Sequence, residues 1–346
     1  MSDTITIGVD HGYAAMKSAH FSFPTGLVEY EYEPYTRKDV LEYGGKFYVV
    51  GSGRQPLQKD KTQTEDYYLL TLAAIAKELE HRQAGPAATI HLAAGLPLTG
   101  FGRDKKKFKE YLFRDGQPVT FRYEWTAYTV TIERVSLFPQ GYAAVLTQQE
   151  LLDEPSVVVA DIGGWTVDLM RLDGRIPNAA TCRSLELGMI RCLDEISEQI
   201  RRSLGLSLTA AQIESVLCGD ANSVDNNAKA IIHREAGTYA RRLLSAITES
   251  GLDVRAMPAI FLGGGAALLR GPHRNPAKRL RWGEEEQRSE RAFAEGGSEG
   301  CEASDDERHV GASDGLCRAF ILDDVCLNAK GYEWLVEQLS AHSSHE

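Results

Sequence analysis

Two segments of the chain share one pattern, in which an apolar strand leads into an aspartate and then into a glycine-containing turn. The first runs from Ile5 to Gly12 and contains Asp10, and the second runs from Val157 to Gly164 and contains Asp161. Glycine lets the backbone come close to a ligand, and N–H groups at tight turns bind phosphate well. An aspartate at each strand end can hold a metal ion or its waters against the phosphates. The repeat therefore predicts two facing turns that grip one polyphosphate tail.

Length and charge limit the classes of protein to which the chain can belong. Its 346 residues, 43% of them hydrophobic, are enough for two domains of ordinary size. The formal net charge is −11, whereas proteins that bind DNA or RNA directly need a basic face. We therefore expect no direct contact with nucleic acid, and any such contact would need an adaptor protein.

The cysteines and the hydropathy pattern indicate a reducing, aqueous environment. The six cysteines are scattered without a CxxC pair, so neither a disulfide framework nor a zinc site is expected. No apolar run approaches the 18 residues of a membrane span, and the N-terminal residues lack the apolar core of a signal peptide. We expect a cytoplasmic protein with no membrane partner.

Strand-like and helix-like segments alternate along the chain, which favours an α/β architecture. Helical spacing of apolar residues predicts helices over about 64–81, 189–204 and 228–250, and Thr209 with Gln212 forms a capping-box pattern for another. The strand 258–262 leads into Gly263, Gly264 and Gly265. Three glycines after a strand are either a flexible turn or a close approach to a ligand, and the helix that follows favours the ligand.

One polar segment interrupts this alternation. Residues 271–311 are poor in apolar side chains, with a basic beginning and an acidic continuation, so they cannot bury enough surface to fold alone. We expect a mobile insertion there. A short strand near residue 320 and a helix that begins at about residue 328 follow it.

Taken together, the motifs resemble those of the actin-like ATPases. Asp10 to Gly12 with Lys17 is similar to their first phosphate loop, residues 161–168 to their second, and residues 261–266 to their adenosine motif. Residues 95–99, 135–142 and 328–332 look most like the plasmid-segregating ParM-like bacterial actins. The resemblance implies an actin-like (ribonuclease H-like) duplicated two-domain α/β fold, with a nucleotide cleft between the domains. Domain I would span residues 1–150 and take back the helix at about 328–346, and domain II would span 151–327.

The resemblance also implies a set of site residues. Asp10 and Asp161 would hold the waters of a Mg²⁺ ion, and Lys17 would contact phosphate oxygens. Gln140 lies where the family places a water-orienting Glu or Gln; because glutamine is a poor general base, hydrolysis should be slow. The remaining residues implied to contact ATP or ADP, or possibly GTP, are Gly12, Tyr13, Gly163, Gly164, Trp165, Thr166, Gly188, Gly263, Gly264, Gly265 and Ala266.

The function that the resemblance implies is nucleotide-dependent polymerisation. Such a chain would assemble head to tail when bound to ATP, and slow hydrolysis would destabilise a filament that segregates plasmid DNA through a centromere-bound adaptor. Two alternatives share the nucleotide motifs. One is a small-molecule kinase of the sugar or acetate type, for which no further Asp-rich motif supplies a catalytic base. The other is an Hsp70-like or division-scaffold ATPase, whose additional substrate domain or membrane helix has no counterpart in this sequence.

Overall fold

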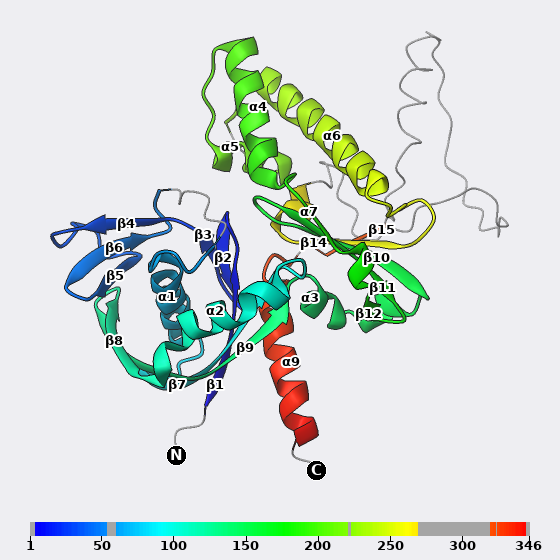
Figure 1. The fold of residues 1–346 in the computed structure, drawn as a ribbon. Coiled ribbons are helices and arrows are strands. Elements are labelled where there is room, and N and C mark those ends of the chain that lie inside the picture. Colours follow the sequence, from blue (N-terminus) through cyan, green and yellow to red (C-terminus); the bar gives the residue numbers. More distant parts are fainter. Residues whose placement is uncertain (1–3, 54–59, 221–222, 269–318, 323, 344–346) are drawn as a thin grey trace, which may run out of the picture.

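The computed structural model describes residues 4–53, 60–220, 223–268, 319–322 and 324–343. The expected insertion at 271–311 lies outside these residues. The described chain builds two sheets, each with its own hydrophobic core (Figure 1). We call the part built on the first sheet lobe I and the part built on the second lobe II, and we propose that they correspond to the two expected domains.

Lobe I is a nine-stranded mixed sheet in the order β3-β2-β1-β7-β9-β8-β5-β6-β4. Helices α1 (Asp66–His81) and α2 (Phe101–Phe113) pack against this sheet. A 3₁₀ turn, η1 (Arg114–Gly116), follows α2. The strands are β1 (Ile5–His11), β2 (Ala15–Ser18), β3 (Ser22–Pro24), β4 (Leu27–Tyr30), β5 (Val40–Tyr43), β6 (Lys46–Val50), β7 (Ala87–Leu96), β8 (Pro118–Tyr123) and β9 (Thr126–Pro139).

Lobe II is a six-stranded sheet in the order β12-β11-β10-β14-β15, with β13 also paired to β11. Its helices α4, α5 and α6 gather at one side of the sheet (Figure 1). The strands are β10 (Ser156–Ile162), β11 (Val167–Asp173), β12 (Ile176–Pro177), β13 (Arg183–Leu185), β14 (Ala259–Leu262) and β15 (Ala319–Ile321). The helices are η3 (Ala179–Thr181), α4 (Met189–Leu204), α5 (Ala210–Leu217), α6 (Asn226–Glu249) and α7 (Gly264–Leu268).

The duplicated sequence pattern corresponds to a duplicated strand arrangement. In lobe I, β1 pairs antiparallel with β2 and parallel with β7; in lobe II, β10 pairs antiparallel with β11 and parallel with β14. The register places Asp10 opposite Lys17 in one hairpin and Asp161 opposite Asp168 in the other. Directly opposed residues project from the same face of a sheet. The seven-residue spacing after each aspartate therefore brings a second charged side chain beside it.

The helices expected from apolar periodicity are present close to their expected bounds. Helix α4 ends at Gly205, whose φ of 66° is the left-handed conformation that glycine adopts readily. Helix α5 begins with the capping box of Thr209 and Gln212, in which each side chain accepts from the other's backbone N–H. Of the helices in the described residues, none is long and apolar enough to cross a membrane.

The chain passes from lobe I to lobe II and later returns to lobe I. It leaves through α3 (Tyr142–Leu146) and η2 (Gln149–Leu152), and it returns through α9 (Leu327–Ser343), which packs on β1 and β7. Figure 1 shows α9 beginning where the two lobes meet. Helices α3 and α9 come close at Gly331, where a Cβ atom would lie 2.5 Å from the carbonyl oxygen of Ala143. A larger side chain at Gly331 would push these two connections apart.

An ionic network around the buried Glu78 attaches α9 to lobe I. Arg82 donates to Glu333 of α9 at 2.7 Å and to Glu78 of α1 at 2.9 Å, and the N–H of Gly8 also donates to Glu333 at 2.8 Å. The Glu78 side chain has no solvent exposure, and its second partner is His20 at 2.8 Å. Burial alone would raise the pKa of Glu78, but hydrogen bonds and the Arg82 charge bring it below its ordinary value. The charge on Glu78 thus depends on its partners.

Replacing Arg82 by methionine should lower the free energy of unfolding by about 2–3 kcal/mol, because Glu78 would stay buried without its cationic partner. Urea unfolding at neutral pH measures the change. The matched control is Arg201→Met, which removes an exposed pair with Glu198 and should cost under about 1 kcal/mol. Equal losses in the two variants would contradict a structural role for the buried network.

Candidate functional site

The first turn follows β1 and is held in place by Thr25. The Thr25 hydroxyl donates to the carbonyl of Gly12 at 2.7 Å, and its N–H donates to the carbonyl of Ala14 at 2.9 Å. A Cβ atom at Gly12 would overlap the carbonyl oxygen of Ala15, so the turn requires glycine there. Asp10, at the strand end, is 3% exposed, and the ammonium of Lys17 lies 3.4 Å from its carboxylate. The turn is therefore rigid and carries a buried acid with a cation beside it.

The second turn follows β10 and is held by the first residues of α4. The N–H groups of Gly188, Met189 and Ile190 donate to the carbonyls of Trp165, Gly163 and Gly164 at 2.9, 3.0 and 2.8 Å. Gly188 cannot carry a side chain, because a Cβ atom would overlap the backbone at Gly164 and Trp165. The first amides of α4 are thus used to position the turn.

Within the second turn, some polar groups are already engaged. The N–H of Gly163 donates to the carbonyl of Thr166 at 2.9 Å, and the Thr166 hydroxyl donates to Asp168 at 3.2 Å. Asp168 also accepts from the hydroxyl of Ser184 on β13 at 2.6 Å. The Gly163 amide therefore has a partner inside the protein, and its expected donation to phosphate stays a prediction.

The two turns touch each other across the junction between the lobes. A Cβ atom built at Gly164 would overlap the Cβ of Ala14 and lie 3.0 Å from the Ala14 nitrogen. Only glycine permits this approach. Residues of the two repeats, about 150 positions apart in the sequence, are thus neighbours in the fold. Two turns that bind one polyphosphate tail must lie close together in this way.

The side chains beside the turns form one buried polar cluster. The Gln140 amide nitrogen donates to Asp10 at 2.6 Å, and Gln140 is 8% exposed. Burial and the nearby Asp10 raise the pKa of Asp161 to about 6. Burial disfavours the charge on Lys17, but the two aspartates prevail and raise the Lys17 pKa. The structure therefore brings together Asp10, Lys17, Gln140 and Asp161, with two acids whose repulsion a bound cation would relieve.

Asn328 also belongs to this cluster, although the sequence analysis gave it no role in the site. Its side-chain nitrogen donates to Asp161 at 2.8 Å, and its side-chain oxygen accepts from the N–H of Gly141 at 2.8 Å. Asn328 is 4% exposed and lies at the start of α9. It therefore connects the carboxylate of the second repeat to the backbone next to Gln140.

Replacing Asn328 by alanine should cost about 1–3 kcal/mol of unfolding free energy, since a buried N–H and a buried carboxylate lose their partner. It should also slow any nucleotide hydrolysis by about tenfold or more, because Asp161 and Gln140 lose their common support. Urea unfolding and phosphate release measure the two effects. Asn227→Ala, on the exposed first turn of α6, is the control. A variant with lowered stability and unchanged turnover would make Asn328 structural only.

The glycine run after β14 has a packing explanation for two of its members. A Cβ atom at Gly263 would overlap the Asp161 carboxylate, and one at Gly265 would overlap Met189 and Ile162. At Gly264, in contrast, a Cβ atom would meet no atom of the described residues within 4 Å, and Ala266 is fully buried. The run therefore lies against the second repeat. Its contact with adenosine stays a prediction, for which Gly264 is the member with room beside it.

A cavity of about 280 Å³ lies next to both turns. Tyr13 of the first turn and Thr166 of the second line it, together with Ser184, which the sequence analysis did not single out. Residues 60–62 and part of the chain from Leu96 to Phe108 complete its wall. Because lobe I and lobe II both contribute, this cavity is where a phosphate tail held by the two turns can extend.

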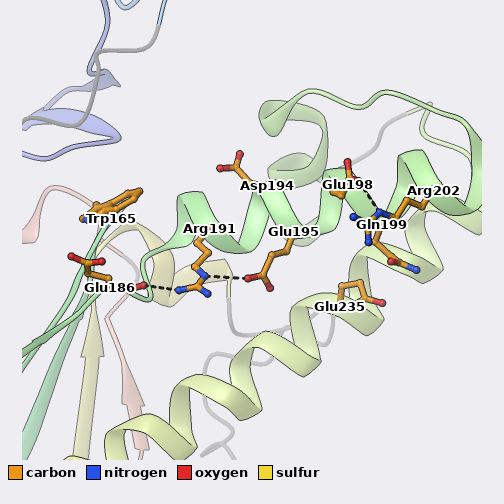
Figure 2. A pocket seen from close by; sticks show the side chains of 9 residues that line it. All are labelled: Trp165, Glu186, Arg191, Asp194, Glu195, Glu198, Gln199, Arg202 and Glu235. Carbon is orange, nitrogen blue, oxygen red and sulfur yellow. Dashed lines mark hydrogen bonds and ion pairs between the residues drawn. The ribbon is translucent and has the colours of Figure 1, made fainter.

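A larger pocket of about 660 Å³ lies along α4 and α6 of lobe II (Figure 2). Trp165 lies at one end, and Arg191 donates to the Glu186 carbonyl and the Glu195 carboxylate. The rest of its lining is polar and mostly acidic: Asp194, Glu198, Gln199, Arg202 and Glu235. Such a lining repels phosphate, so the smaller cavity suits a polyphosphate tail better.

A direct protein cage for a metal ion is absent from the part of the chain that the structure describes. No group of three or more His, Cys, Asp or Glu side chains is placed there to hold an ion. Magnesium usually keeps several waters and takes one or two carboxylates. The paired acids Asp10 and Asp161 fit that pattern of binding.

Comparison with known proteins identifies the architecture. Residues 8–142 match the family described as "Actin like proteins N terminal domain". The archaeal actin homologue Ta0583, in its complex with ADP, superposes with a TM-score of 0.68 at 19% identity, covering 97% of this chain and 100% of that one. The chain has the actin-like fold.

Two ParM structures share this actin-like fold. Bacillus thuringiensis ParM with ATP superposes with a TM-score of 0.63 at 15% identity, covering 97% of this chain and 99% of that one. A 15-stranded ParM filament from Clostridium botulinum gives 0.66 at 18% identity, with coverage of 97% and 99%. No curated protein matches the chain by sequence. The expected fold class and the resemblance to ParM-like actins are thus confirmed.

Proposed function

We propose that the protein binds and hydrolyses a nucleoside triphosphate, ATP in the first instance, between its two lobes. The observation that carries this proposal is the contact between Ala14 and Gly164, which brings both glycine turns to one point beside Asp10 and Asp161. Ta0583 has been solved with ADP and B. thuringiensis ParM with ATP, which supports a nucleotide as the ligand.

In this proposal each residue of the cluster has a separate role in phosphoryl transfer. Lys17 contacts phosphate oxygens, while Gly12, Gly163 and Gly164 shape the turns that hold the tail. Gln140 orients the attacking water; as an amide it cannot remove the proton, so turnover is slow. Asn328 keeps Asp161 in place. The nucleoside part of the ligand is contacted by residues in and around the second turn, namely Trp165, Gly188, Gly264 and Ala266.

Asp10 and Asp161 are the residues that would hold Mg²⁺ through its waters. Bound Mg²⁺ neutralises charge on the phosphate oxygens, which phosphoryl transfer requires. Their fit to the ion is supported by the burial of both carboxylates and by the raised pKa of Asp161, which is caused first by burial and then by the nearby charge of Asp10.

We propose further that nucleotide binding drives assembly into filaments. The ParM filament from C. botulinum and the Alp12 filament share the actin-like fold with this chain, with TM-scores of 0.66 and 0.58. A head-to-tail interface that does not close into a ring produces such polymers. A cytoplasmic filament of this kind would move plasmid DNA through a DNA-bound adaptor, because a net charge of −11 disfavours direct contact with DNA.

Light scattering and pelleting test this function directly. Addition of ATP with Mg²⁺ to the full chain should raise the scattering, and the signal should fall as phosphate is released. ADP, or ATP with a chelator, serves as the control and should give little polymer. ATP hydrolysis without any scattering or pelleted protein would overturn the filament proposal. Phosphate transfer to a sugar or to acetate in place of assembly would support a kinase.

A further inference from the structure

Lys61 is a buried cation without an acidic partner among the described residues. It follows β6 and lies in the turn before α1, where it is 8% exposed. Its ammonium donates to the carbonyl of His11, the residue immediately after Asp10 in the first repeat. An ammonium has three donors, and this bond uses one of them. A charge that is buried without a counterion is costly, so the site calls for an anion.

Lys61 lies in the wall of the cavity beside both turns. The ammonium lies 4.8 Å from the centre of the Tyr13 ring and 5.6 Å from that of Tyr67. Both Lys61 and Tyr13 line the cavity of about 280 Å³, and Thr166 and Ser184 of lobe II line it as well. Burial lowers the pKa of Lys61 to about 8, against the influence of Asp10 and Asp168. An anion bound beside this cation would offset the free energy that burial of its charge costs.

His11 offers no competing charge in this place. Its ring is fully buried, it shares a hydrogen bond of 2.9 Å with Thr71 of α1, and it meets the edge of Phe108. His11 is also not among the described residues that line the cavity. Arg103 and Lys107 also line the cavity, and Lys61 is the lysine that contacts the backbone of the first turn there.

We propose that Lys61 binds the terminal phosphate of the nucleoside triphosphate and so distinguishes it from the diphosphate. The proposal rests on the proposed nucleotide function. The contact exists only while the terminal phosphate is attached, and it joins the segment before α1 to a ligand that is also held by lobe II. Loss of the phosphate removes this connection between the lobes.

The test compares Lys61→Met with Lys61→Arg and with Lys109→Met, an exposed lysine of α2 outside the cavity. Affinities for ADP and for a non-hydrolysable ATP analogue, each with Mg²⁺, are measured by calorimetry. Lys61→Met should lose about tenfold to a hundredfold in affinity for the triphosphate, the value of a hydrogen bond to a charged group, and keep its affinity for ADP. Lys61→Arg should recover part of the loss, and Lys109→Met should match the unmodified chain.

The outcomes separate this inference from the function on which it rests. If the unmodified chain binds neither nucleotide, the proposed function fails. If it prefers the triphosphate and Lys61→Met keeps that preference, the role of Lys61 is overturned while the function stands. Equal losses of ADP and triphosphate affinity would mean that Lys61 only maintains the conformation of the first turn. That result would likewise overturn the proposal. Thermal unfolding of each variant confirms that the chain is folded during the measurement.

Discussion

Replacing Asp161 by asparagine should reduce phosphate release from ATP by at least about a hundredfold while it stabilises the ligand-free protein. Activity should fall because the site loses one of the two acids proposed to hold magnesium. Stability rises because the carboxylate is buried near Asp10, which raises its pKa to about 6. Each pKa unit corresponds to about 1.4 kcal/mol, so the gain should be about 1–3 kcal/mol at neutral pH. Asparagine can still accept the hydrogen bond from Asn328.

The pH dependence of this gain follows from the direction of the pKa shift. Well below pH 4, near which an aspartate of the unfolded chain titrates, the carboxyl is protonated in both the folded and the unfolded chain, so the variant and the unmodified protein should be equally stable. Between that pH and the folded-state pKa of about 6, only the unfolded chain releases the proton, and the unmodified protein loses stability as the pH rises. The difference in melting temperature should therefore be largest at pH 7 and above.

A control on the same hairpin should behave in the opposite way. Asp173, at the far end of β11, has a pKa lowered to about 2 by its hydrogen bonds, first of all with Arg171. Asp173→Asn should therefore lower stability slightly and leave phosphate release unchanged. If Asp161→Asn hydrolysed ATP at the unmodified rate, Asp161 would have no part in the mechanism. If it were less stable than the unmodified chain, the two acids would not repel each other in the fold.

Replacing Gln140 by alanine should slow phosphate release by roughly tenfold to a hundredfold, because the attacking water loses the group that orients it. Nucleotide affinity should change little, since the role proposed for Gln140 concerns the water and not the ligand. Filaments should consequently persist longer after ATP is added. Single-turnover phosphate release and the decay of light scattering measure the two effects.

Gln117→Ala provides the matched control for this experiment, because Gln117 is an exposed glutamine in the turn before β8. It should leave both turnover and filament lifetime unchanged. Normal depolymerisation with normal phosphate release in Gln140→Ala would remove Gln140 from catalysis. Slow release with unchanged filament lifetime would separate hydrolysis from disassembly and contradict their proposed coupling.

The sequence was sufficient for the elements whose signals are local. Apolar periodicity predicted α4 and α6, Gly205 predicted the end of α4, and the Thr209 and Gln212 pair predicted the start of α5. These features depend on neighbouring residues only. The repeated strand-Asp-Gly pattern predicted two strands that end in glycine-containing turns, and the structure shows that each of them, β1 and β10, opens an antiparallel hairpin.

The contacts between distant segments were not predictable in the same way. Asn328 is 167 residues from Asp161 along the chain, and a polar residue at the start of a helix has an ordinary explanation as a cap. Lys61 lies in a polar stretch in which a lysine is expected to be exposed. The glycine run after β14 is the opposite case, because the sequence marks it clearly but does not show its cause. Gly263 and Gly265 permit close packing against Asp161, Ile162 and Met189. A sequence shows that side chains are absent there, but the fold shows what takes their place.

A crystal structure of the full chain with Mg²⁺ and a non-hydrolysable ATP analogue would show whether the two turns bind one nucleotide. We expect phosphate density between the turn at Gly12 to Ala14 and the turn at Gly163 to Thr166, with the ion next to Asp10 and Asp161. A triphosphate seated in the acidic pocket along α4 and α6, away from both aspartates, would contradict it. An empty space between the turns at saturating nucleotide would contradict it equally.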